Sequence, residues 1–151
     1  MTGTPKAYLA HLARGSDLLR SEQIDDARDE LEKALALRPG DARIMNLLGL
    51  VYFRLGRYPD AQSIYADLVK RQPMDASLRL NLGLVHLKRG EVDDAIRELN
   101  RARELDPAQV RTMGYLGLAF ARKGRFALAR DAFHAAGQDE LAREMDQQLA
   151  A

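Results

Sequence analysis

The chain has 151 residues, of which 46% are hydrophobic and 30% charged, so it can bury a core and stay soluble. Its 23 basic and 22 acidic residues leave a net charge of +1, which gives no overall attraction to nucleic acid or acidic membranes. The absence of cysteine excludes disulfides and thiolate metal sites, and no apolar run approaches the roughly 18 residues that span a bilayer. The N-terminal stretch lacks the apolar segment of a signal peptide, so we expect a cytoplasmic protein without membrane insertion.

Apolar residues recur at helical spacing along the chain, in runs that are separated by turn signals. In chain order, the pattern predicts helices near residues 7–20, 24–37, 42–55, 58–71, 76–89, 92–105, 110–123 and 126–136. Asp41 and Asp75 stand where helix N-caps belong, because their side chains can accept hydrogen bonds from free backbone N–H groups. Gly56, Gly90 and Gly124 follow basic last turns, where a left-handed C-cap favours glycine. A last amphipathic helix is expected over residues 139–150.

A segment of 34 residues recurs along the chain. The stretches "NLLGLVYFRLGRYPDA" (46–61), "LNLGLVHLKRGEVDDA" (80–95) and "GYLGLAFARKGRFALA" (114–129) align without gaps, and a divergent copy precedes them. Leu-Gly pairs align at Gly49, Gly83 and Gly117, while the divergent copy has Arg14 in place of the leucine. This pattern of Leu-Gly, then a large residue, alanines and a closing proline resembles the tetratricopeptide repeat (TPR) family.

The resemblance implies an all-α fold, a right-handed α-solenoid of antiparallel helix pairs. A single TPR domain is then expected over residues 1–151, with repeats near 8–41, 42–75, 76–109 and 110–138 and a capping helix at 139–150.

Residues that could suggest a catalytic centre have simpler interpretations. His86 occupies the repeat position of Tyr52 and Phe120, so we interpret it as a packing residue with one satisfied hydrogen bond. Paired carboxylates such as Asp93 and Asp94 begin a helix, where acidic side chains complement the helix dipole. Gly83 lies inside a predicted helix, which indicates close helix–helix approach. We therefore predict no enzyme activity, no cofactor and no metal site, because no metal ligands are expected to cluster.

The resemblance also implies a partner-binding groove along the first helices of the repeats. The family's groove positions fall in this chain on Arg43, Asn46, Leu50, Phe53, Arg54, Leu80, Asn81, Leu84, Leu87, Lys88, Arg111, Tyr115, Leu118 and Arg122. Arg20, Arg54, Lys88 and Arg122 recur once per repeat and form a basic ladder, which either holds partner carboxylates or only complements helix C-termini.

The leucines at these positions form an expected apolar stripe, which either binds a partner or packs against neighbouring helices. Some TPR domains clamp a C-terminal carboxylate with lysine, asparagine and arginine. Of the matching positions here, only Asn81 and Arg111 suit that role, which argues against such a receptor.

The sequence supports three functional hypotheses. The leading hypothesis is a protein–protein interaction module or adaptor that binds a peptide or helix with apolar anchors and acidic character. The alternative is a self-associating scaffold segment of a larger bacterial assembly. Nucleic-acid binding ranks last, because leucine rather than exposed aromatic residues dominates the expected groove.

Overall fold

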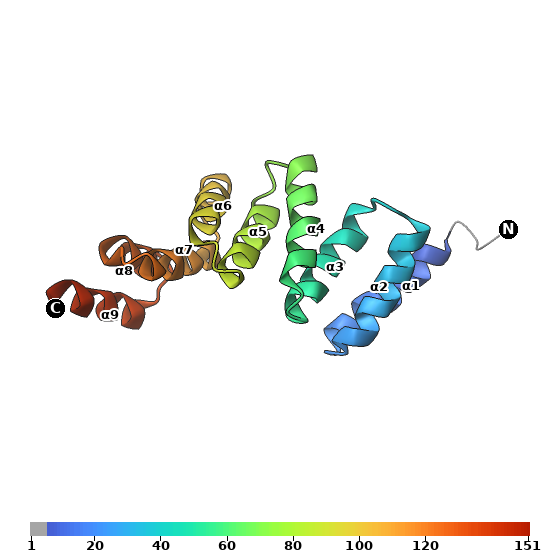
Figure 1. The fold of residues 1–151 in the computed structure, drawn as a ribbon, viewed down its shortest axis with the longest axis horizontal. Helices are drawn as coiled ribbons and strands as arrows, with labels where there is room; N and C mark the ends of the chain where they lie inside the picture. Colours follow the sequence, from blue (N-terminus) through green and yellow to red (C-terminus); the bar gives the residue numbers. More distant parts are fainter. Residues whose placement is uncertain (1–5) are drawn as a thin grey trace. The chain divides into compact units, whose positions relative to one another are not determined.

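The computed structural model describes residues 6–151, so the first five residues of the predicted domain lie outside the described part of the chain. The described residues form helices and connecting turns (Figure 1). In chain order these are α1 (Ala7–Arg20), α2 (Ile24–Leu37), α3 (Ala42–Arg54), α4 (Tyr58–Arg71), α5 (Ala76–Lys88), α6 (Val92–Leu105), α7 (Val110–Arg122), α8 (Phe126–Ala135) and α9 (Asp139–Ala150). The predicted all-α fold is confirmed, and each predicted helix end lies within one residue of the observed end.

The helix ends form as their residue types predict. The side chain of Asp41 accepts hydrogen bonds from the backbone N–H groups of Arg43 and Ile44, and Asp75 accepts one from Leu78. These bonds satisfy donors that have no partner within the helix. Past the C-terminal ends of the first helices, Gly56, Gly90 and Gly124 have φ angles of 74°, 76° and 72°, a conformation that side chains with a Cβ rarely adopt.

Glycines inside the first helices allow the two helices of a repeat to pack closely. A Cβ added to Gly83 of α5 would lie 2.8 Å from Cγ of Leu99 on α6. At the same position of the next repeat, a Cβ on Gly117 would lie 2.5 Å from the ring of Phe133. Such distances are too short for carbon atoms, so the prediction of close helix–helix approach at Gly83 is confirmed.

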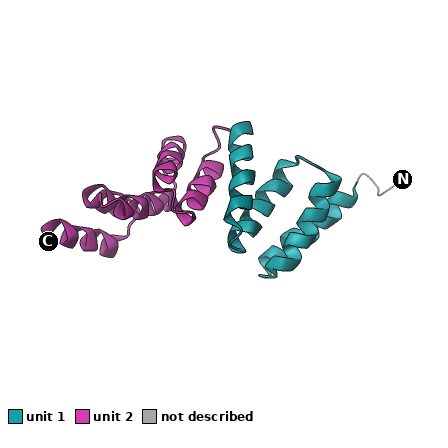
Figure 2. Ribbon diagram, viewed as in Figure 1, with its two compact units in different colours: residues 1–71 teal, residues 72–151 magenta. Residues whose placement is uncertain are grey.

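The chain divides into two compact units (Figure 2). Unit 1 covers residues 1–71 and contains the helix pairs α1–α2 and α3–α4, while unit 2 covers residues 72–151 and contains α5–α6, α7–α8 and α9. Each unit has a cluster of buried apolar side chains that joins successive helix pairs. In unit 1 the cluster includes Leu31, Ile44, Leu48 and Val51. In unit 2 it includes Leu99, Leu116, Phe120, Phe133 and Ala142.

The last helix, α9, contributes to the core of unit 2. It packs against α8, its Ala142 is fully buried, and Leu141 and Met145 lie against the core cluster. An amphipathic helix at this place shields the apolar side of the last repeat from water. Over residues 6–151, no helix has both the length and the apolar character that crossing a membrane requires.

Candidate functional site

The predicted groove residues of unit 1 lie on α3 and differ in how they are engaged. Arg43 is exposed, but its guanidinium pairs with Asp41 at 3.0 Å. The hydrogen bond from Arg43 is the main reason that the pKa of Asp41 lies below its usual value, in spite of the opposing effect of burial. Arg54 pairs with Glu22 beyond the end of α1. Both arginines therefore already have acidic partners within unit 1.

The other groove residues of unit 1 present a small apolar surface. Asn46 is exposed on α3, and Leu50 has 39% of its surface accessible. Phe53 is half-buried and makes an edge-to-face contact with Tyr58, their ring centroids being 5.5 Å apart. An isolated exposed leucine is ordinary on a protein surface, so these residues alone do not mark a site.

Two leucines expected in the apolar stripe belong instead to the core of unit 2. Leu80 and Leu87 on α5 retain only 3% and 5% of their accessible surface and share the core cluster with Leu116 and Phe120 of α7. They pack against the following helix pair, which is the alternative that the sequence left open. The continuous stripe predicted from the sequence is therefore wrong at these two positions. Leu84, between them on α5, is half-buried against the same core.

The basic ladder is partly a set of helix-end contacts. In unit 2, Nη1 of Arg122 donates a hydrogen bond to the backbone oxygen of Leu87 at 2.8 Å, at the C-terminal end of α5. A cation at this place stabilises carbonyl groups that have no partner within the helix. Lys88, one residue further on, is exposed and takes part in no ion pair within residues 6–151. The lysine remains free to contact an acidic group, whereas Arg122 already has a structural role.

Three predicted residues come together at a pocket between α7 and α9, which we call the α7–α9 pocket. Its volume is about 250 Å³, and its lining residues are Val110, Arg111, Gly114, Tyr115, Leu118, Ala136, Gln138 and Leu141. Leu118 has 40% of its surface accessible and Val110 has 53%, so the pocket wall is both apolar and open. Arg111 provides a positive charge at this wall.

Arg111 is positioned by its own helix. Its guanidinium carbon lies 6.0 Å from the centre of the Tyr115 ring, one helical turn away. The backbone N–H of Arg111 donates to the side chain of Gln109, which caps α7. Among the described residues Arg111 has no carboxylate partner. An unpaired arginine beside apolar side chains is well suited to bind a carboxylate that arrives with an apolar group.

Sequence reasoning missed the wall that α9 contributes. Leu141 of α9 packs on the core, and its surface also lines the pocket. Gln138, in the turn before α9, approaches α7 because Gly114 lacks a side chain: a Cβ there would lie 3.0 Å from Oε1 of Gln138. A glycine inside the predicted helix at residues 110–123 was the available sequence signal for this approach.

The remaining groove residue of unit 2 is Asn81, which is half-buried on α5 at the position that Tyr115 has on α7. We define the first-helix surface of unit 2 as the groove residues that keep accessible surface without a structural bond. These residues are Asn81, Leu84, Lys88, Arg111, Tyr115 and Leu118.

The histidines do not converge on a catalytic centre. Nδ1 of His11, His86 and His134 lies near a different carboxylate in each case, at 2.6 Å from Glu30, 3.1 Å from Glu91 and 3.3 Å from Asp139. His86 is half-buried with this one bond, as predicted for a packing residue.

The expectation that no metal ligands cluster needs correction. Potential ligand atoms of His86, Glu91 and Asp94 lie within 4.8 Å of one another. Glu91 also lies 3.8 Å from the guanidinium of Arg89, and Asp94 pairs with Arg97, so both carboxylates already face cations. The cluster is explained as ion pairing at the turn between α5 and α6.

Comparison with known proteins agrees with this architecture. The model of the family described as "Tetratricopeptide repeat" matches residues 12–61, 46–110 and 85–142. A search of curated protein sequences gives no match.

Several solved structures have the same fold. A structure described as MamA 41-end from Desulfovibrio magneticus RS-1 is 23% identical, with a TM-score of 0.83 over 89% of this chain and 76% of that one. Another crystal structure of MamA is 25% identical, with a TM-score of 0.75 over 97% and 82% of the two chains. YrrB, described as a TPR protein with an unusual peptide-binding site, is 22% identical, with a TM-score of 0.82 over 94% and 75%.

Proposed function

Because the chain belongs to the tetratricopeptide repeat family, we propose that it is a non-catalytic protein-binding module that uses the first-helix surface of unit 2. The partner segment has an apolar side chain next to a carboxylate. The apolar side chain enters the α7–α9 pocket, and the carboxylate binds Arg111. The observation that carries this proposal is the open apolar pocket beside an arginine without an acidic partner.

The physical chemistry of the pocket favours this class of partner. Burying Leu118 and Val110, which keep 40% and 53% of their accessible surface, removes apolar area from water. Arg111 gains a charge-assisted hydrogen bond, and the Tyr115 ring beside it limits the side-chain freedom that binding must remove. Lys88 supplies a second positive charge on α5 that attracts an acidic segment.

The remaining predicted residues have smaller roles in the proposal. In this proposal Asn81, which is half-buried, and Asn46, which is exposed, bond the partner backbone. Leu50 and Phe53 add a lesser apolar contact in unit 1. We also keep as proposals a cytoplasmic location and one TPR domain over the whole chain. The absence of cysteine and the overlapping family matches are their support.

Co-purification from the source cell with two matched double variants tests the proposal. Leu118→Glu with Arg111→Glu alters the α7–α9 pocket. Leu149→Glu with Arg143→Glu makes the same change of charge on α9, where Leu149 has 48% of its surface accessible and neither residue lines the α7–α9 pocket. We expect the first variant to lose a partner that the wild type and the second variant retain. If the first variant is folded and keeps every partner, the proposed function is wrong.

A further inference from the structure

The first helices of unit 2 carry positive charge only. Neither α5 nor α7 contains an aspartate or a glutamate, and together they have four basic residues besides histidine. Arg79 pairs with Glu98 of α6 at 2.9 Å, and Arg122 is bonded to the end of α5. Lys88 and Arg111 have no carboxylate partner within residues 6–151. Two free cations therefore remain on a surface without acidic side chains.

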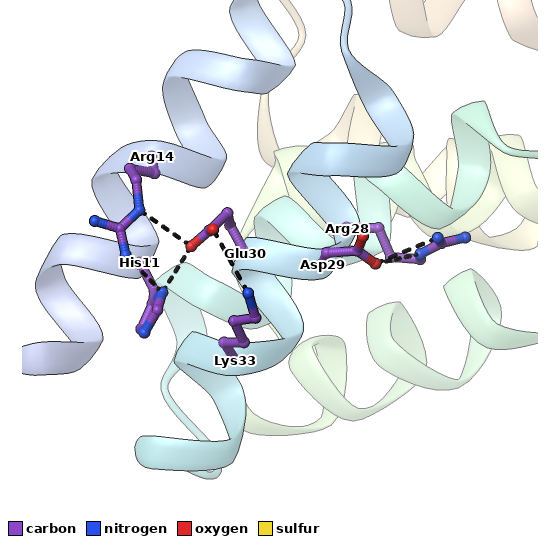
Figure 3. Close-up of polar contacts among 6 residues, drawn as sticks. All are labelled: His11, Arg14, Arg28, Asp29, Glu30 and Lys33. Carbon is purple, nitrogen blue, oxygen red and sulfur yellow. Dashed lines mark hydrogen bonds and ion pairs between the residues drawn. The ribbon is translucent and has the colours of Figure 1, made fainter. Parts of the chain in front are cut away.

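The first helices of unit 1 show the opposite arrangement, because all four arginines of α1 and α3 already face a carboxylate. Arg14 donates to Glu30 of α2 (Figure 3), and Arg20, Arg43 and Arg54 pair with Asp17, Asp41 and Glu22. A partner carboxylate would have to compete with these groups. Within the described chain, the first helices thus offer unpaired basic side chains in unit 2 and none in unit 1.

The two free cations lie at opposite ends of two parallel helices. Since Arg122 at the end of α7 reaches Leu87 at the end of α5, the two helices run side by side in the same direction. Ser77 of α5 is the repeat equivalent of Arg111 and precedes Lys88 by eleven residues, which is about 16 Å along a helix. Contacting helices are about 8–10 Å apart, so the diagonal from Arg111 to Lys88 measures about 19 Å.

Two side-chain amides on the same side of unit 2 lack partners. Asn81 is half-buried on α5, at a level between those of Arg111 and Lys88, and Gln138 lines the α7–α9 pocket. Neither amide bonds another described residue. An amide offers a donor and an acceptor, which match the free backbone groups of an extended segment. A helix bonds its own backbone groups, so these amides favour an extended partner.

We propose that the first-helix surface of unit 2 binds an extended acidic segment whose two carboxylates are about six residues apart. The inference rests on the proposed function and adds the spacing that selects the partner. One carboxylate, next to the apolar side chain in the α7–α9 pocket, binds Arg111, and the other binds Lys88. Six extended residues span about 20 Å, and an even spacing places both side chains on one face.

The test is a titration of the full chain, labelled for NMR, with blocked peptides of one composition. Acetyl-SLDSTSTSDS-amide and acetyl-SDSTSTLDSS-amide place the aspartates six residues apart in the two possible chain directions, and acetyl-SLDSDSTSTS-amide places them two apart. At low salt, one of the six-spaced peptides should bind about two- to fivefold more tightly than the two-spaced peptide, the effect of one exposed ion pair. In about 1 M sodium chloride this preference should disappear, because charges are then screened.

Variants of the free cations assign the preference to its residues. Lys88→Gln should weaken binding of the preferred six-spaced peptide to the level of the two-spaced peptide, whose own binding it should not change. Lys70→Gln, at an exposed lysine of α4 that makes no ion pair in the described chain, should leave every affinity unchanged. Arg111→Gln should weaken all three peptides, because each has a leucine followed by an aspartate.

The outcomes separate the inference from the proposed function. Equal binding of the six-spaced and two-spaced peptides, with both weakened by Arg111→Gln, would overturn the spacing and leave the proposed function standing. No binding, or binding that Arg111→Gln does not weaken, would count against both. A helical peptide with carboxylates eleven residues apart spans about 16 Å on one face. If it bound more tightly than either six-spaced peptide, the extended partner would be wrong.

Discussion

At the scale of single residues, the repeat pattern predicts packing better than it predicts surface chemistry. The packing roles of Gly83 and His86 on α5 are predictable from the sequence, because equivalent positions in other repeats restrict them. The bonds of Arg43, Arg54 and Arg122 could not be predicted in the same way. Their partners depend on how long side chains reach across turns, which the sequence spacing does not determine.

The close approach at Gly83 gives the first prediction. Gly83→Ala should lower the free energy of unfolding by about 1–3 kcal/mol, because the new Cβ would lie 2.8 Å from Leu99 Cγ inside the core. Gly114→Ala is the control. It also lies inside a helix, but its Cβ would meet only the flexible end of Gln138, so alanine should be neutral or stabilising there. Urea denaturation of both variants checks this, and equal destabilisation would contradict the packing argument.

The polar cluster in which Glu30 of α2 contacts His11 and Arg14 of α1 gives a prediction about how stability depends on pH. Hydrogen bonding to His11 is the main cause that lowers the pKa of Glu30 below its usual 4.5, with Arg14 adding to it against the opposing effect of burial. A lowered pKa in the folded state stabilises the protein above pH 4.5, and that contribution is lost as the pH falls below it. Glu30→Gln should therefore lose less stability than the wild type during acid titration.

Thermal unfolding of wild type and Glu30→Gln at a series of acidic pH values measures this difference. Glu104→Gln, at an exposed ion pair with Arg101 on α6, controls for the loss of one carboxylate. Parallel acid profiles of the wild type and Glu30→Gln would contradict the assigned role of the cluster.

At the scale of helices, their bounds were predictable because caps, turn glycines and apolar periodicity agree with one another. The face that each helix buries was less predictable. The segment of α5 from Leu78 to Leu87 is apolar on nearly all sides, so periodicity alone could not separate exposed leucines from core leucines. Packing against α7 decides which leucines of α5 are buried, and this packing joins residues about 30 positions apart in the sequence. The pocket wall supplied by α9 was missed for the same reason.

The contact of α9 with the last repeat gives a prediction about the stability of variants in this helix. Ala142 is fully buried, so Ala142→Asp would place a carboxylate in the core of unit 2 and should lower stability by at least about 2 kcal/mol. Arg143→Asp, at the next and exposed position, should have less than about a quarter of that effect. Chemical denaturation compares the two variants. Equal effects would show that α9 does not pack as described.

At the scale of the whole molecule, the chain consists of repeated helix pairs, in which the two helices of a pair contact each other and, within each unit, the neighbouring pair. In such proteins stability is approximately a sum of terms for each repeat and each interface between neighbours. A change in the core of one unit should therefore be felt most strongly within that unit. Leu31 in unit 1 and Leu99 in unit 2 make a matched pair, because both are fully buried and both contact the glycine of the partner helix.

Leu31→Ala and Leu99→Ala should each cost about 2–5 kcal/mol, with the larger loss of amide protection in the unit that carries the substitution. Native-state hydrogen exchange measures protection helix by helix. If both variants reduce protection equally over α1–α4 and α5–α8, the two units unfold as one and the repeat-based account of stability is wrong.

The central claim is that the first-helix surface of unit 2 is where a partner protein binds. Site-specific photo-crosslinking in the source cell tests it most directly. The photoreactive residue p-benzoylphenylalanine is placed at Tyr115, in the α7–α9 pocket, or at Ala66, an exposed position on α4 of unit 1. We predict a defined crosslinked partner from position 115, lost when Arg111→Glu is added, and none from position 66. A partner crosslinked only from position 66 would contradict the claim.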